Sequence, residues 1–152
     1  CKISEDSQDL KEQLLQLIDK DNDSFILVMD AYKLPKKTPK DIKIRKTAID
    51  LAMKEATNIP FLTLTCCVQI IELAIKVAKF GNPNAISDAG VSGEMAHAGS
   101  NGAALNILIN LKQIQDSKYC QKMKDKTNLL VDKTNENLMI LRGIIKDTLN
   151  NE

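Results

Sequence analysis

The sequence predicts an all-α protein, an antiparallel bundle of about five helices of which several are long. Apolar residues recur at spacings of three, four and seven through most of the chain, which is the period of a buried helix face. No stretch has the pattern of a strand, and the four prolines divide the chain into helical segments. At 152 residues the chain is most simply one domain, residues 1–152.

The first two helices are expected over residues 4 or 6 to 33 and 38–58. Leu34 precedes Pro35, and a residue before proline disfavours the helical conformation, so the first helix ends there. Thr38 can cap the second helix, Pro39 suits its first position, and Asp41 lies near the positive end of the helix dipole.

The other three helices are expected over residues 60–81, 87 or 88 to 116, and 117–149. Pro60 begins the first of these three helices and Gly81 ends it. The next is rich in glycine, alanine and serine, and each glycine costs about 1 kcal/mol of helix propensity relative to alanine. Close backbone packing would offset that cost, so this helix is predicted to be the central one.

The stretch DKDNDSFILVMD, residues 19–30, has acidic residues at positions one, three, five and twelve of a calcium-binding loop. Its sixth position, however, is Ser24 instead of the usual glycine, and its ninth is Leu27. The apolar run FILVM and the helical spacing around it favour a long helix with acidic residues facing water. Calcium binding is kept as a weaker alternative.

Composition excludes several classes of protein. The chain has 21 Lys and Arg against 20 Asp and Glu, and aromatics make up 3% of it, which argues against a nucleic-acid binder. One histidine and four cysteines without CxxC spacing make a zinc site improbable, so reduced, buried thiols and no metal are expected. We expect no apolar run long enough to span a membrane, no signal peptide, and a cytoplasmic location.

Polar residues within or beside the helices are the candidates for a site. Asn106 and Asn110 lie four apart on one helix face, where they either bond a neighbouring helix or line a pocket. Asn82, Asn84 and Asp88 cluster in the polar break, where turn and cap chemistry is equally possible.

The remaining candidates have simpler interpretations. Lys33, Lys36 and Lys37 gather at a helix end, where the helix dipole alone explains them. His97 lies nine residues after Asp88, on roughly the opposite face, so a structural or surface role is expected for it.

Several segments, in order along the chain, resemble the C-terminal domain family of formiminotransferase-cyclodeaminase. They are Asp21 with Phe25, AYKLPKKT (31–38), Arg45, IPF (59–61), GNPNAISDAG (81–90) and GAALNILINL (102–111). The resemblance implies an all-α homodimer acting on tetrahydrofolate one-carbon adducts. A cyclodeaminase closes 5-formimidoyltetrahydrofolate to the 5,10-methenyl form with release of ammonia, whereas a cyclohydrolase opens the methenyl ring with water. The sequence does not choose between them, although we lean slightly to the cyclodeaminase.

Both reactions pass through a cationic amidine-type carbon, which a carboxylate can stabilise while it transfers a proton. Asp88 is the first candidate for this catalytic role and Asp21 the second. Amide side chains suit the pterin ring and cations suit the glutamate tail, which often has several residues. The candidates for substrate binding are Asn82, Asn84, Asn106, Asn110, Lys33, Lys36, Lys37 and Arg45.

One departure from the family pattern matters. The family has a glycine-rich segment ahead of the first helix, and this sequence lacks it. A non-catalytic helical dimerisation module is therefore the alternative function. No cofactor is expected beside the folate substrate, and the expected partners are that substrate and a second copy of the chain.

Overall fold

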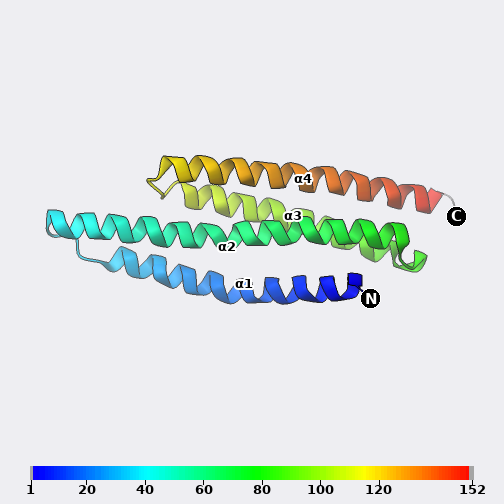
Figure 1. The fold of residues 1–152 in the computed structure, drawn as a ribbon, viewed down its shortest axis with the longest axis horizontal. Coiled ribbons are helices and arrows are strands. Elements are labelled where there is room, and N and C mark those ends of the chain that lie inside the picture. Colours follow the sequence, from blue (N-terminus) through cyan, green and yellow to red (C-terminus); the bar gives the residue numbers. More distant parts are fainter. Residues whose placement is uncertain (1, 151–152) are drawn as a thin grey trace.

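The computed structural model describes residues 2–150, which form a bundle of long helices without strands. The helices are α1 (Lys2–Lys33), α2 (Pro39–Phe80), α3 (Ile86–Leu111) and α4 (Ser117–Asn150), with a single 3-10 turn, η1 (Pro83–Ala85), before α3. Figure 1 shows α1 and α4 on either side of α2, with α3 behind α2 and α4. The all-α prediction is confirmed, but the number of helices is four instead of about five.

The difference in number comes from Pro60, which was expected to begin a helix and instead lies buried inside α2. Proline has no N–H to donate, so it leaves the carbonyl four residues earlier, that of Ala56, without its helical partner. The side chain of Asn110 on α3 donates to this carbonyl at 3.2 Å. Tertiary packing therefore supplies the bond that the local sequence removes, and the helix continues.

The ends of α2 follow the sequence closely. Thr38 and Asp41 form a reciprocal capping box, with Pro39 in the first turn, and the Gly81 N–H closes the other end on the Val77 carbonyl. At the end of α1, Arg45 donates from Nε and Nη2 to the Tyr32 carbonyl at 3.3 and 3.1 Å, and its guanidinium lies over the Tyr32 ring. This clamp fixes the connection between α1 and α2.

The central helix is α2, not α3 as expected, because α2 packs against each of the other three. The glycines of α3 nevertheless mark close approaches. A Cβ on Gly93 would overlap Leu141 of α4, and one on Gly99 would lie 3.2 Å from the Cys67 sulfur of α2. The glycine-rich stretch thus brings α3 close to two helices at once.

Stretch 19–30 is continuous helix in α1, so it forms no calcium loop. Successive acidic residues there point in different directions, and the described residues contain no group of three or more acidic, cysteine or histidine side chains able to hold a metal. The thiols of Cys66 and Cys67 are buried as expected and that of Cys120 is half-buried, while Cys1 lies outside the described residues.

Within residues 2–150, α2 alone is long and apolar enough to cross a membrane, judged by length and composition, with a window of mean hydropathy 1.8. The expectation that no segment meets this criterion is therefore wrong. The core helix of a bundle meets the same criterion, and α2 contacts three other helices. Its position in this fold is that of a core helix.

Candidate functional site

A long groove separates α1 from α3. Both helices pack on α2, yet within the described chain no Cα atom of α1 lies within 8 Å of one of α3, so α2 forms the floor between them. One section of the groove encloses about 510 Å³ and the next about 490 Å³. The two sections share Leu14 and Ile18 of α1, which makes them continuous.

The first section, which we call the amide section, combines polar side chains with an apolar floor. Asp21 and Asn22 line it from α1, Asn106 lines it from α3, and Pro60 and Thr63 line it from α2. Gly99 and Gly102 also line it, so α3 leaves space where side chains would otherwise fill the groove. A carboxylate and amide groups therefore face one cavity that a flat, polar ring system could enter.

The second section, which we call the serine section, is more apolar and contains Asp88. Ser7 and Lys11 of α1 and Ser92 of α3 line it together with Asp88. Asp88 is exposed and has no ion-pair partner in the described part of the chain. The carboxylate is thus free to interact with a ligand or with another molecule.

The two candidate carboxylates do not share a section. Asp88 and Asn106 are 18 residues apart on the same helix, which corresponds to about 27 Å along its axis. Asn110 lies one turn beyond Asn106 and uses its amide to bond Ala56. Within one chain, therefore, the structure brings together Asp21 and Asn106, and it places Asp88 elsewhere in the groove.

The remaining amide candidates serve the connection between α2 and α3. The Asn82 Oδ1 atom accepts the Asn84 N–H at 3.0 Å and thereby caps η1. Both side chains are exposed, on the same connection that leads to Asp88. The turn chemistry accounts for these two residues without a ligand.

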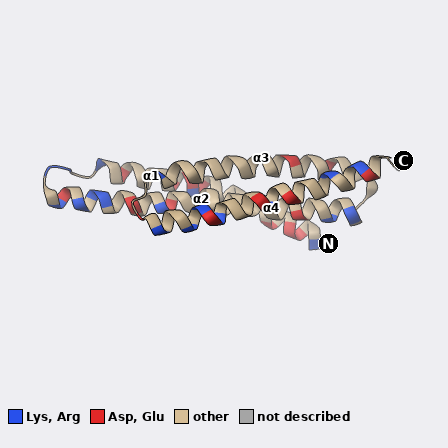
Figure 2. Cartoon of the chain, turned by 90° about the horizontal axis from the view of Figure 1, so that it is seen from above, with Lys and Arg blue, Asp and Glu red and all other residues tan. Residues whose placement is uncertain are grey.

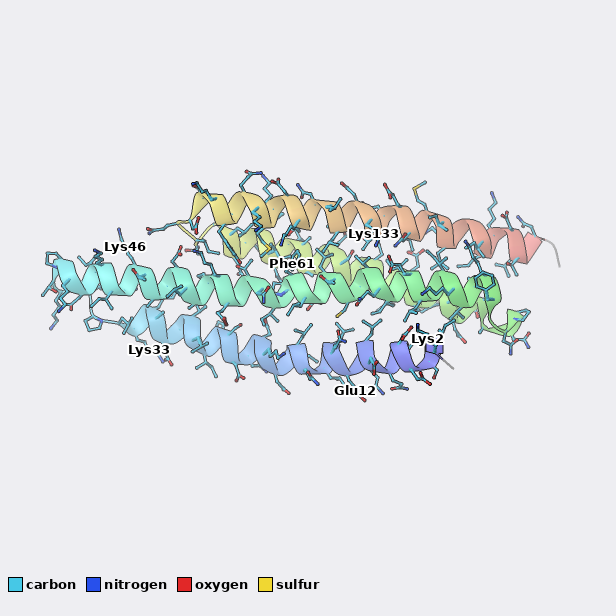
Figure 3. The ribbon with its side chains drawn as sticks, viewed as in Figure 1. Lys2, Glu12, Lys33, Lys46, Phe61 and Lys133 are labelled. Atoms are coloured by element: carbon cyan, nitrogen blue, oxygen red, sulfur yellow. The ribbon has the colours of Figure 1, made fainter. Side chains whose placement is uncertain are left out.

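The cationic candidates gather at the opposite end of the bundle. Lysine and arginine are dense at the end where α1 meets α2, as Figure 2 shows, and Figure 3 places Lys33 and Lys46 there. Lys33 pairs with Asp30 at 2.8 Å, Arg45 is occupied by its bonds to Tyr32, and Lys36 and Lys37 are exposed in the connection. Lys33 lies 12 residues from Asp21 on α1, about 18 Å along the helix.

A group that the sequence did not single out holds the turn between α3 and α4. The Lys54 ammonium bonds Asp50 at 3.0 Å and Asp116 at 2.9 Å, and Asp50 accepts the Gln115 N–H at 2.7 Å. Burial raises the pKa of Asp50, but Gln115 and Lys54 outweigh it and hold the pKa below its ordinary value. The Tyr119 N–H and Lys54 lower the pKa of Asp116 as well.

His97 has the structural role that was expected. Its Nε2 atom lies 2.8 Å from the Asn135 Oδ1, which ties α3 to α4, and the neighbouring Glu94 holds Arg142 of α4 through a bidentate ion pair. These contacts lie on the side of α3 that faces α4. They leave the groove side of the helix to Ser92 and Asn106.

Comparisons with known proteins agree with this arrangement. The family model of formiminotransferase-cyclodeaminase matches residues 2–129, which is most of the chain. The chain belongs to this family. The crystal structure of formiminotetrahydrofolate cyclodeaminase from Thermotoga maritima has the same fold, with a TM-score of 0.80 and 24% identity over 93% of this chain and 67% of that one.

Two relatives from the formiminotransferase-cyclodeaminase family carry different names. Methenyltetrahydrofolate cyclohydrolase of Methylorubrum extorquens is 38% identical over 86% of this chain. Formimidoyltransferase-cyclodeaminase of Rattus norvegicus is 28% identical over 88% of it. The chain spans 63% of the length of the first and 25% of the second.

Proposed function

We propose that this member of the formiminotransferase-cyclodeaminase family acts on a tetrahydrofolate one-carbon adduct bound in the amide section of the groove. The observation that carries the proposal is the position of Asp21 opposite Asn106 across a cavity of about 510 Å³, floored by α2. Asparagine amides both donate and accept, which matches the edge of a pterin ring, and the apolar floor suits its face.

In the cyclodeaminase reaction, N10 of 5-formimidoyltetrahydrofolate attacks the formimidoyl carbon, and a new C–N bond forms. The formimidoyl group reacts as its protonated amidinium, whose terminal nitrogen already carries two hydrogens. The proton of N10 must leave and become the third hydrogen on that nitrogen before its bond to carbon breaks and ammonia departs. The Asp21 carboxylate takes that proton and returns it to the leaving nitrogen, so the charge balances in the 5,10-methenyl product. Its negative charge also stabilises the cationic carbon between the two nitrogens.

A cyclohydrolase is the second candidate, because the relative with 38% identity carries that name whereas the formimidoyltransferase-cyclodeaminases match at 28–29%. In that reaction water adds to the methenyl carbon, and the same carboxylate takes one proton from the attacking water. The bond from that carbon to N5 then breaks as the remaining hydroxyl proton passes to N5, which leaves a formyl group on N10. Both reactions need one carboxylate beside one cationic carbon, so the groove supports either. The substrate that the chain turns over decides between the cyclodeaminase and the cyclohydrolase.

The lysines at the end of the bundle suit the glutamate tail of the substrate. They lie about 18 Å along α1 from Asp21, a distance that several extended residues span. Lys36 and Lys37 are exposed in the connection from α1 to α2, whereas Lys33 and Arg45 already have partners within the chain. We therefore propose that Lys36 and Lys37 contact a polyglutamylated tail, and that the chain works as a homodimer in the cytoplasm without a further cofactor.

The experiment supplies 5-formimidoyltetrahydrofolate and 5,10-methenyltetrahydrofolate in turn and follows the methenyl absorbance. A rise with the first substrate identifies the cyclodeaminase, and an accelerated fall with the second identifies the cyclohydrolase. Calorimetry with the product then measures binding separately from turnover. No binding and no turnover would contradict the proposal and leave the non-catalytic dimerisation module.

A further inference from the structure

A second hollow lies between α1 and α4. In the described chain no Cα atom of α1 lies within 8 Å of one of α4, so α2 forms the floor between these two helices as well. Figure 1 shows α1 and α4 on either side of α2. The hollow encloses about 800 Å³, a volume within the range of small-molecule sites in proteins. We call it the α1–α4 hollow, and it shares no lining residue with the amide section or the serine section.

Small residues leave the space of the hollow open, and larger apolar residues surround it. Ala31 of α1 lines it together with Ala48 and Ala52 of α2, so methyl groups stand where longer side chains would fill the space. Leu27 and Leu51 line it as well and remain 53% and 59% exposed. Covering their exposed surface with a ligand gains free energy in proportion to the apolar area removed from water. This part of the hollow therefore favours an apolar group.

The other end of the floor is polar. Glu55 and Asn58 of α2 line the hollow and lie three residues apart, so they share a face of the helix. Both side chains are exposed, and within residues 2–150 neither makes an ion pair or a side-chain hydrogen bond. Glu55 follows Ala48 by seven residues, about 10 Å along the helix. An apolar end and an unpaired carboxylate with an amide thus lie about one small molecule apart.

The charges around the hollow favour a cationic ligand over an anionic one. Lys54 lines the hollow, but Asp50 at 3.0 Å and Asp116 at 2.9 Å already hold its ammonium. Two carboxylates around one ammonium leave this wall with a net negative charge, and Glu55 adds an unpaired carboxylate to it. Asp30, which also lines the hollow, pairs with a neighbouring lysine at 2.8 Å. An anion would therefore have to compete with carboxylates for Lys54, whereas a cation finds Glu55 free.

We propose that the α1–α4 hollow binds a small organic cation, with its apolar body against the alanines and leucines and its ammonium or amidinium group at Glu55 and Asn58. Such a group donates hydrogen bonds, which the Glu55 carboxylate and the Asn58 carbonyl oxygen accept. Tyr119 and Met123 of α4 form the wall opposite α1. This site is independent of the proposed folate site, because different residues line the two.

Isothermal titration calorimetry on the full chain tests the chemical class of the ligand. The probes are 4-phenylbutylammonium, the neutral alcohol 4-phenylbutanol and the anion 4-phenylbutyrate, which share one apolar body, each at pH 7 without folate. The ammonium should bind about tenfold more tightly than the alcohol, as an ion pair with Glu55 in a partly enclosed site allows. The anion should bind more weakly than the alcohol. An ammonium that does not bind, or binds no more tightly than the alcohol or the anion, would overturn the site.

Two variants separate the charge from the apolar contact. Glu55→Gln should weaken binding of the ammonium about five- to tenfold and leave the alcohol unchanged. Leu51→Ser should weaken both probes by the same factor, because both lose the same apolar contact. Glu12→Gln on α1 and Leu129→Ser on α4 change exposed residues that do not line the hollow, and they should bind as the wild type does. Wild-type affinity in Glu55→Gln, or an equal loss in Glu12→Gln, would contradict the assignment.

The methionine methyl signals in an NMR spectrum locate the bound cation. Met123 lines the hollow, whereas Met139 lies 16 residues later on α4, about 24 Å along the helix. With isotopically labelled methionine, 4-phenylbutylammonium should shift the Met123 signal and leave the Met139 signal in place, although Met139 is 73% exposed. An unmoved Met123 signal, or equal shifts of both signals, would show that the cation binds elsewhere or without a defined site. These measurements involve no folate, so a chain without folate turnover leaves their outcome unchanged.

Discussion

Asn110 of α3 donates its side-chain N–H to the carbonyl of Ala56 in α2 across 3.2 Å. That carbonyl is the one that Pro60 leaves without a partner, because proline cannot donate a hydrogen bond. One side chain thus allows a proline inside a 42-residue helix and joins α2 to α3, the pair of helices with the most extensive contact in the described bundle. The same bond occupies an asparagine that the sequence offered as a ligand for substrate.

Asn110→Ala is expected to lower the free energy of unfolding by about 1–3 kcal/mol, the cost of leaving a half-buried carbonyl unpaired. In a Pro60→Ala background the new N–H can bond the Ala56 carbonyl, so the same Asn110→Ala change should cost less. Urea denaturation of the four proteins in this double-mutant cycle measures the difference. Equal costs in both backgrounds would show that the asparagine does not compensate for the proline.

Gly93→Ala is expected to destabilise the chain by about 1–3 kcal/mol, because the added Cβ overlaps Leu141 in a packed interface. Gly143→Ala on α4 is the matched control. A Cβ there meets nothing within 4 Å, so the change should raise stability by about 0.5–1 kcal/mol through helix propensity. Thermal unfolding of both variants checks the prediction, and a destabilised Gly143→Ala or a neutral Gly93→Ala would contradict it.

Acid should loosen the turn between α3 and α4. The pKa values of Asp50 and Asp116 lie below their ordinary value of 3.8, so both carboxyls bind protons more readily in the unfolded chain. The stability that they contribute is therefore present above pH 3.8 and is lost as the pH falls through the lowered values. Below about pH 5, where stability depends on the protonation of carboxyl groups, the unfolding free energy of Asp50→Asn should vary less with pH than that of the wild type.

Asp23→Asn is the matched control for this experiment, because Asp23 is an exposed aspartate on α1, outside the Lys54 cluster. Its variant should keep the pH dependence of the wild type. An unchanged acid profile in Asp50→Asn would show that the Lys54 cluster does not couple the turn to pH.

Cys67 should resist alkylation in the folded chain. Burial, and then the neighbouring Cys66, raise the pKa of its thiol to about 11, so almost no thiolate is present at neutral pH. Iodoacetamide at pH 8 followed by peptide mass analysis should therefore modify Cys67 only after denaturation. Rapid modification of the native chain would contradict the packing of α2 against Gly99 of α3.

The sequence predicted the helices where local chemistry decides them. Thr38, Pro39 and Asp41 form the predicted start of α2, and Gly81 forms the predicted end. The break predicted at Pro60 is absent because the effect of this proline on the helix depends on Asn110, 50 residues later in the chain. The period of a pattern cannot show which helix supplies a missing hydrogen bond, so the sequence predicts two helices where the structure has one.

The candidate site was predictable in its residue types but not in its grouping. Asp21 and Asn106 were both candidates, and the structure places them in one section of the groove. Their proximity depends on α1 and α3 packing side by side on α2, which spacing along either helix does not reveal. Asp88 and Asn106 were both candidates for the same substrate, but the length of α3 separates the two within one chain.

The most direct test of the proposed site is the initial rate with 5-formimidoyltetrahydrofolate for Asp21→Asn beside the matched control Asp23→Asn. Asp23 lies two residues away on the same helix, is exposed, and does not line the groove. Loss of a proton-transferring carboxylate should lower kcat by about 10²-fold or more, while Asp23→Asn keeps the wild-type rate. Wild-type turnover by Asp21→Asn would contradict the account.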